Sequence, residues 1–254
     1  MVKKTRYIVA NWKMNLTIHE GSLLLHQLDQ QIETGEGVEI VLAPSFIGLQ
    51  SLSLQADRKR FKLAAQNLYW RDEGAFTGEI SANQLRGLVK YAIIGHSERR
   101  NLFSERGRDI GRKVQAAIRN DIRPILCIGE SALERAEGEA SDVLHDQIVG
   151  GLSNLTSDDL EHVLIAYEPI WAVGSGKSAV PADVKDVAKV IRAQVKHMFG
   201  DKAASSIPIL YGGSVTSTNT KAFLDTPGVN GLLIGGASLD AKHFAKIIDK
   251  AHDR

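Results

Sequence analysis

The chain has 254 residues, of which 43% are hydrophobic, a composition that supports one substantial core and excludes both a disordered chain and a mini-protein. Its 31 Lys and Arg residues balance 30 Asp and Glu residues, and the formal net charge of +1 predicts neither a nucleic-acid partner nor an anionic membrane surface. The single cysteine, Cys127, cannot close an intramolecular disulfide, and the eight histidines show no metal-binding spacing, which argues against a disulfide scaffold and a zinc site.

The N-terminal sequence indicates a protein that is not exported. Residues 1–6 run directly into the apolar residues 7–10, which are too few for the core of a signal peptide and lack a small-residue cleavage site. No apolar run approaches the roughly 20 residues that a transmembrane helix needs. We therefore expect a soluble, cytoplasmic protein with no membrane partner.

Short apolar runs alternate along the whole chain with longer segments of helical spacing. The spacing predicts helices within residues 23–32, 110–118 and 184–191, where apolar side chains recur every three or four positions. Eight short runs predict strands: 7–10, 38–42, 62–65, 91–94, 124–128, 163–167, 207–211 and 231–234.

The strand composition indicates a parallel sheet. The runs are continuously apolar, which is typical of strands that helices cover on both faces. Eight strand and helix units in one chain of this length predict a single-domain (β/α)8 barrel of the α/β class, with residues 1–254 as one catalytic domain. A doubly wound open sheet is the alternative that periodicity leaves open.

In such a barrel the chemistry lies in the loops that follow the strands. Lys13 follows the first strand and would complement an anionic substrate. His96 follows the fourth strand; if Ser97 and Glu98 open a short helix, its positive end disfavours an imidazolium ion and leaves a neutral ring that can exchange protons with a carbonyl. Glu168 follows the sixth strand, and its apolar neighbours would raise its pKa if the next loop closes. Taken singly, these residues also fit a solvated lysine, a strand-capping histidine and a surface carboxylate.

Glycines follow the last two strands. Residues 212–214 and 235–236 offer unobstructed backbone N–H groups, and the second pair precedes an apparent helix from Ser238; both suit a phosphate, although tight turns are the alternative. The long loop 168–179 has a proline near its start, at Pro169, and glycines toward its end, at Gly174 and Gly176, as a hinged lid would. It is no P-loop, because Trp171 stands where that motif needs glycine.

Three further features have ordinary interpretations. Cys127 lies inside an apolar strand without a general base and is expected in the core. Trp12 and Trp171 are expected to pack, and the basic residues of the predicted helix 106–119 are expected to form a solvated face. The remaining set of phosphate cradle, cation, histidine and carboxylate indicates proton transfer on a small phosphorylated carbonyl compound.

Six segments closely resemble the signature segments of the triosephosphate isomerase family. The similarity runs from residue 7 to about 246 without large insertions, although 86–90 is one residue shorter than usual. The resemblance implies an isomerase without metal or organic cofactor that interconverts dihydroxyacetone phosphate and D-glyceraldehyde 3-phosphate through an enediol(ate), in glycolysis and gluconeogenesis. The six segments are 10–15, 74–79, 95–100, 124–130, 166–171 and 211–215.

The resemblance also implies catalytic roles. Glu168 would be the base that moves a proton between adjacent carbons, and neutral His96 would polarise the carbonyl and shuttle protons between the two enediol oxygens. Lys13 would offset the negative charge of the enediolate and the phosphate, and Asn11 would position Lys13 and the substrate. Glu98 belongs to the same motif as His96, without a defined role.

The same resemblance implies phosphate-binding positions and a subunit contact. The phosphate would be held by Gly174, Ser214, Gly235 and Gly236. Thr77 matches the tip of a loop that reaches into a neighbouring subunit, which implies a homodimer.

Two other functions are alternatives to the isomerisation of a triose phosphate. An isomerase of a four-carbon ketose phosphate would keep the same base and histidine, but the intact lid segment 174–179 favours the three-carbon substrate. A non-catalytic binding protein on this barrel would be expected to have lost Lys13, His96 or Glu168, and all three are present.

Overall fold

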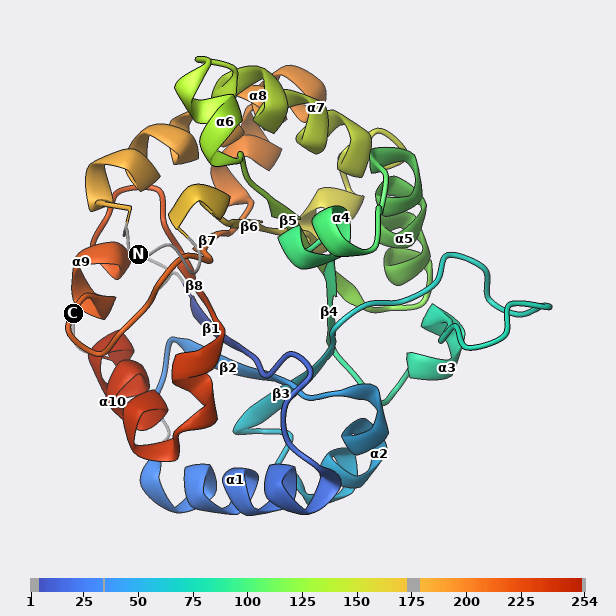
Figure 1. Ribbon diagram of the computed structural model, residues 1–254, viewed down its shortest axis with the longest axis vertical. Coiled ribbons are helices and arrows are strands. Elements are labelled where there is room, and N and C mark those ends of the chain that lie inside the picture. Colours follow the sequence, from blue (N-terminus) through green and yellow to red (C-terminus); the bar gives the residue numbers. More distant parts are fainter. Residues whose placement is uncertain (1–4, 34, 173–178, 253–254) are drawn as a thin grey trace.

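The computed structural model describes residues 5–33, 35–172 and 179–252. Eight parallel strands form a closed barrel in chain order, with β8 paired to β1 (Figure 1). This confirms the predicted (β/α)8 barrel against the open sheet, and every predicted strand is found with its ends shifted by two residues at most. The strands are β1 (Arg6–Asn11), β2 (Val38–Ala43), β3 (Phe61–Ala65), β4 (Tyr91–Ile94), β5 (Arg123–Ile128), β6 (Leu164–Tyr167), β7 (Ile209–Tyr211) and β8 (Gly231–Ile234).

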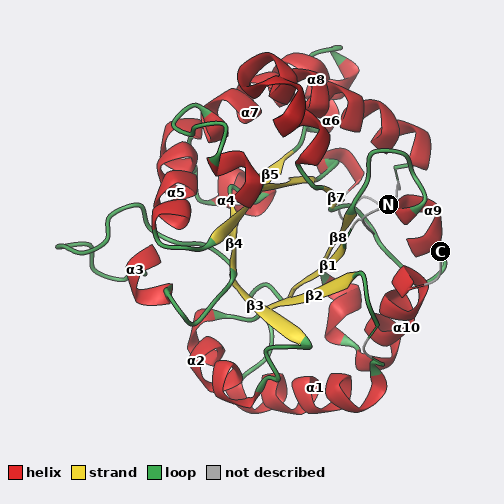
Figure 2. Ribbon diagram, turned by 180° about the vertical axis from the view of Figure 1, so that it is seen from behind, coloured by secondary structure: helices red, strands yellow, loops and turns green. Residues whose placement is uncertain are grey.

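Helices form a ring outside the strands (Figure 2). The predicted helical segments all belong to this ring, and within the described residues three short 3-10 helices lie in the connections. The α-helices are α1 (Ile18–Gln31), α2 (Phe46–Gln55), α3 (Ala82–Leu85), α4 (Ser97–Leu102), α5 (Gly107–Arg119), α6 (Ala132–Ala136), α7 (Ala140–Leu152), α8 (Pro181–Ser206), α9 (Thr220–Leu224) and α10 (Ala241–His252), and the 3-10 helices are η1 (Asp159–His162), η2 (Ile170–Ala172) and η3 (Gly236–Leu239).

Two apolar clusters explain why the strands read as continuous apolar runs. Successive strand residues point to opposite faces, so Ile8 packs with helix residues such as Leu28 in one cluster. Its neighbour Val9 belongs to a second cluster, which contains strand residues and lies inside the barrel. Cys127 is fully buried in this inner cluster, which confirms its prediction as a core residue.

The prediction of a solvated face on α5 is wrong for one of its basic residues. Lys113 is buried, because it stands on the same helix stripe as the core residues Ile110 and Val114. Its Nζ donates to Asn67 Oδ1 at 2.8 Å and to the Glu105 carboxylate, which also accepts from Arg99 Nε. The other basic residues of the segment are exposed, as expected: Arg106, Arg108, Arg112 and Arg119.

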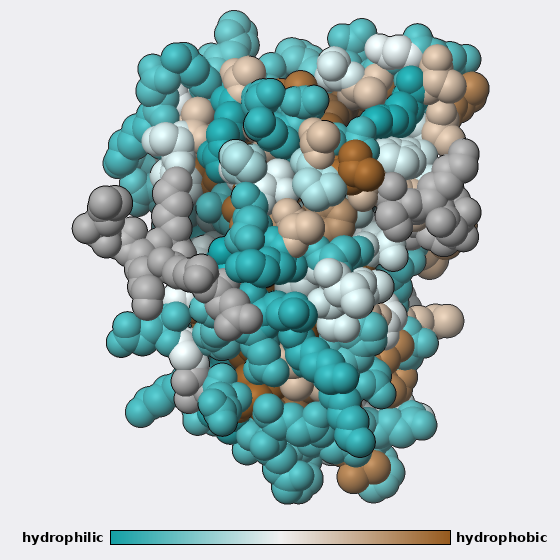
Figure 3. All heavy atoms as spheres, turned by 90° about the vertical axis from the view of Figure 1, so that its left-hand side faces the viewer, coloured by the Kyte–Doolittle hydropathy of each residue, from teal (hydrophilic) through white to brown (hydrophobic). Residues whose placement is uncertain are grey.

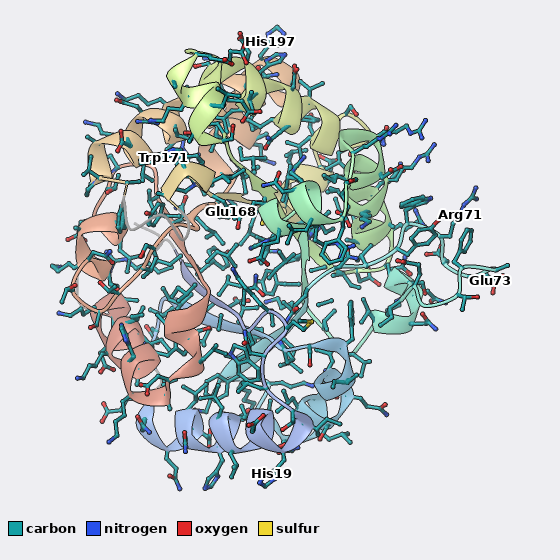
Figure 4. All side chains as sticks on the ribbon, in the orientation of Figure 1. His19, Arg71, Glu73, Glu168, Trp171 and His197 are labelled. Carbon is teal, nitrogen blue, oxygen red and sulfur yellow. The ribbon has the colours of Figure 1, made fainter. Side chains whose placement is uncertain are left out.

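The surface has one projecting segment and one mostly hydrophilic face. The segment between β3 and α3 projects away from the barrel (Figure 1), and Arg71 and Glu73 lie on it (Figure 4). The face that carries α9 and α10 is mostly hydrophilic (Figure 3). Within the described ranges, none of the helices is long and apolar enough to cross a membrane.

Candidate active site

A pocket of about 290 Å³ opens at the carboxyl ends of the strands. Side chains and backbone from the ends of β1, β4, β6, β7 and β8 and from the segments after them line it, so the topology brings together residues as far apart as Asn11 and Ala237. Seven of the residues predicted for the site lie in its wall: Asn11, Lys13, His96, Glu168, Ser214, Gly235 and Gly236.

Glu168 is the most deeply buried ionisable group of the pocket wall, with 3% of its surface exposed. Its side chain lies beside α4 (Figure 4). His96 Nε2 is 2.8 Å from its Oε1, and the backbone N–H of Ser97 donates to its Oε2 at 2.9 Å. Both carboxylate oxygens therefore have partners, and the orientation of the side chain is fixed.

His96 is the N-cap of α4, so Ser97 and Glu98 do open a short helix, which was the condition for the expected neutral ring. Its Nδ1 accepts the backbone N–H of Glu98 at 3.2 Å, so the lone pair of Nδ1 is occupied and the ring carries its proton on Nε2. This places the donor nitrogen of the imidazole toward Glu168 and the pocket.

The chain reaches this arrangement because Gly95 has a φ of 71°, in the left-handed region. A Cβ there would be strained, and it would also lie 3.1 Å from the Ile110 side chain and 3.0 Å from Arg100 Nη2. Glycine at this position lets β4 turn directly into α4 and brings His96 over the barrel mouth.

The pKa values of Glu168 and His96 are shifted in the directions opposite to those expected from the sequence. Burial raises the pKa of Glu168, but His96, the Ser97 N–H and Lys13 outweigh it, so the pKa is lowered and not raised. Burial lowers the pKa of His96, but the Glu168 and Glu98 carboxylates outweigh it and the pKa is raised. The helix start alone would disfavour the imidazolium ion; the contact with Glu168 reverses that effect.

Lys13 is held by its backbone and by a carboxylate. Its φ of 53° is unusual for a residue other than glycine. The Lys13 N–H donates to Asn11 Oδ1 at 3.1 Å, its carbonyl accepts from Gln66 Nε2 at 2.8 Å, and its Nζ donates to Glu98 Oε1. Gln66 was missed in the sequence, although its position directly after β3 was the available signal.

The glycines after β7 and β8 leave space that any other residue would fill. A Cβ on Gly212 would lie 3.0 Å from Glu168 Cγ, and one on Gly213 would lie 2.2 Å from the Tyr211 hydroxyl. The apparent helix from Ser238 begins earlier than predicted, as the 3-10 helix η3 at Gly236, with Gly235 before it. Its first N–H groups therefore lie in the pocket wall, where an anion can accept from them.

Two residues after β5 support the site and were not predicted for it. A Cβ on Gly129 would lie 1.8 Å from the Glu168 carbonyl oxygen, so glycine allows β5 and β6 to approach there. Glu130 is fully buried and accepts from the Tyr167 hydroxyl at 2.9 Å and from Trp171 Nε1 at 2.8 Å. Trp171, expected only to pack, thus has a polar anchor as well.

Some predicted residues lie elsewhere. Thr77 is exposed on the projecting segment. Gly174 lies outside the described residues, as do the other residues of 173–178 in the predicted lid. Within the described part of the chain, no group of three or more His, Cys, Asp and Glu residues could hold a metal ion.

Comparison with known proteins gives one consistent result. A sequence model of the triosephosphate isomerase family matches residues 6–251. The triosephosphate isomerase of Chloroherpeton thalassium is 40% identical over 250 residues, which cover 98% of this chain and 99% of that protein. Those of Natranaerobius thermophilus and Trichlorobacter lovleyi are 40% and 39% identical, over 96% of this chain and 95% and 98% of theirs.

Proposed function

Since the chain belongs to the triosephosphate isomerase family, we propose that the pocket at the barrel mouth is where it interconverts dihydroxyacetone phosphate and D-glyceraldehyde 3-phosphate. The observation that carries the assignment is the 2.8 Å contact of His96 Nε2 with Glu168 Oε1, in a pocket that Lys13 also lines. A base, a proton donor and a cation thereby meet at one position.

Glu168 acts as the base of the reaction. Its lowered pKa keeps it ionised, and it removes a proton from the carbon beside the carbonyl and returns it to the neighbouring carbon. His96 donates from Nε2 to the carbonyl oxygen as the enediol(ate) forms and moves a proton between the two oxygens. Because Nδ1 is held by the Glu98 N–H, Nε2 is the nitrogen that exchanges the proton.

The substrate replaces the contact between these two residues. At 2.8 Å there is no room for a carbon and an oxygen between His96 and Glu168, so the two side chains separate when the substrate binds. The separation removes the carboxylate that raises the pKa of His96, and the helix start then favours the neutral imidazole. Substrate binding thus favours the neutral form of His96, with its proton on Nε2, as the donor in the reaction.

The negative charges of the substrate are matched by Lys13 and by backbone N–H groups in the pocket wall. Lys13 offsets the developing enediolate and the phosphate charge, and Asn11 holds the Lys13 backbone. The phosphate lies against Ser214, Gly235 and Gly236, where backbone N–H groups are unobstructed. Gly174 is proposed as a further phosphate contact, and Glu98 as the residue that positions Lys13 before the substrate arrives.

We also propose a homodimer, one catalytic domain over residues 1–254 and a cytoplasmic location. The dimer is supported by exposed apolar side chains around the pocket and on the projecting segment: Met14, Phe76, Leu102 and Phe103 are 96%, 38%, 75% and 63% exposed. A second copy would cover such surface, with Thr77 in the contact.

The activity is tested with purified protein in a coupled assay that starts from glyceraldehyde 3-phosphate. A parallel reaction with a tetrulose phosphate tests the four-carbon alternative, which the names of the relatives do not favour. Turnover of the triose phosphate that disappears in Glu168→Ala supports the proposal, and equal turnover of both substrates would contradict it.

A further inference from the structure

A second cavity lies at the opposite end of the barrel. Its volume is about 500 Å³, and it lies between α8 and the segment 227–230 that leads into β8. Ser205, near the end of α8, also lines it. Since the active-site pocket lies past the carboxyl ends of β7 and β8 and this cavity lies before their amino ends, the two are separate sites.

The described residues that line this cavity include three cations and no carboxylate. Lys185, Lys189 and Arg192 are spaced by four and three positions on α8, which places them on one face of the helix. Lys185 makes no ion pair among the described residues. Lys189 pairs with Asp186 at 2.8 Å at the rim, where both side chains are about two-thirds exposed or more, and such a pair offers little neutralisation.

Arg192 is the fixed member of the three. Its Nη2 donates to the Gly228 carbonyl at 3.1 Å and to Asn230 Oδ1 at 3.3 Å, and its Nη1 donates to the carbonyls of Ala204 and Ile207. All four acceptors are neutral, and burial lowers the pKa of the guanidinium with no carboxylate opposing it. A half-buried cation is thus held in place without a counter-charge from the described part of the chain.

We propose that this cavity binds a small polyanion, a molecule that carries phosphate or carboxylate groups. Arg192 is immobilised before the ligand arrives, so it loses little conformational freedom on binding. Both of its Nη groups already donate to protein oxygens, so it contributes fixed positive charge to the cavity and not a bidentate contact. Lys185 and Lys189 add charge at the rim. The volume lies in the usual range for small-molecule sites.

The site is tested by equilibrium dialysis of the full chain with labelled pyrophosphate at about 150 mM salt, where diffuse attraction is screened. Wild-type protein should bind at two classes of site. Lys13→Met should remove the active-site class alone, and the double variant Lys185→Gln, Lys189→Gln should weaken the other class at least about tenfold, since charge-assisted bonds dominate such sites. Arg192 is left intact because its bonds hold the end of α8.

The matched control is the double variant Lys196→Gln, Lys202→Gln. It removes the same charge from exposed lysines of the same helix, which pair with Asp201 and Glu161 outside the cavity, and it should bind pyrophosphate as the wild type does. A parallel titration with labelled citrate tells phosphate from carboxylate ligands. The isomerase activity of the Lys185, Lys189 variant should be unchanged.

Two results would overturn the proposal. The first is a single class of pyrophosphate site that Lys13→Met abolishes. The second is an equal loss of pyrophosphate affinity in the two double lysine variants, which would show attraction to a basic helix and not binding in a cavity. Neither result bears on the isomerase. Conversely, a Lys13→Met protein that keeps both classes of site would contradict the role of Lys13 and leave the second site standing.

Discussion

Glu168 and His96 partner each other in the active-site pocket. The arrangement keeps both groups satisfied although they are almost fully buried, which an isolated carboxylate would not tolerate. It also keeps the base in its ionised form, with Nε2 of His96 facing the carboxylate until the substrate separates the two side chains.

We predict that Glu168→Ala lowers kcat at least about 10²-fold. A positioned acid or base usually contributes about 10² to 10⁴-fold. Steady-state kinetics beside circular dichroism tests this, with Glu137→Ala, an exposed carboxylate, as the matched control. Activity within about tenfold of the wild type in a folded Glu168→Ala protein would remove Glu168 from its role.

Lys13 acts through its charge, since its backbone is already fixed by Asn11 and Gln66. Lys13→Met keeps much of the side-chain length and loses the charge. We expect it to abolish detectable binding of phosphoglycolate, a phosphorylated mimic of the enediolate, in a calorimetric titration. Unchanged affinity would show that the glycine cradle alone holds the ligand.

At the scale of elements, the position of Glu168 depends on how closely β5 and β6 approach. A Cβ on Gly129 would meet the Glu168 carbonyl oxygen at 1.8 Å, and a backbone clash cannot be relieved by a rotamer change. We predict that Gly129→Ala displaces Glu168 and lowers kcat at least about tenfold, because catalytic geometry is sensitive to shifts of about 1 Å. Gly48→Ala, whose Cβ would meet only a side chain at 3.8 Å, is the control; wild-type kcat in Gly129→Ala would contradict the prediction.

The buried carboxylate of Glu105 joins α5 to the segment after α4. Burial raises the pKa of Glu105, but Lys113 and Arg99 outweigh it, and the pKa is lowered. The resulting stabilisation is complete above the pKa of the unfolded chain and is lost as pH falls through the lower pKa of the folded state.

We therefore predict that Glu105→Gln lowers the free energy of unfolding by about 3 kcal/mol at pH 7, because it leaves the Lys113 charge buried without its partner. The deficit should shrink as the pH falls below about 4. Denaturant titrations at the two pH values measure both effects. A deficit that stays constant with pH would assign the loss to packing and not to charge.

The strands and the start of α4 were predictable because they depend on local pattern. Continuous apolar runs indicate two-sided burial, and Ser97 and Glu98, shortly after the end of β4, suit the first turn of a helix. The place of Lys113 on the buried stripe of α5 could be read from the helical spacing, but its pairing with Asn67, 46 positions away, could not. The lowered pKa of Glu168 was missed for the same reason: it depends on His96, which only the closed barrel brings within reach.

At the scale of the whole molecule, the exposed apolar side chains near the pocket predict self-association. Light scattering should give about twice the 27.7 kDa mass of one chain. The double variant Phe76→Asp, Thr77→Asp should shift the measured mass toward that of one chain and should lower the isomerase activity. A fully active monomer at micromolar concentration would show that one chain completes the site alone.

The closed ring also sets an order of events during synthesis. β1 is made first but pairs with β8, and Arg6 donates to the Ala251 carbonyl across 245 positions. Contacts of such large sequence separation form late, so a nascent chain carries two unpaired strand edges until β8 has been made. Unpaired edges recruit other strands, and the interval before ring closure is therefore the stage at which this protein is most exposed to aggregation.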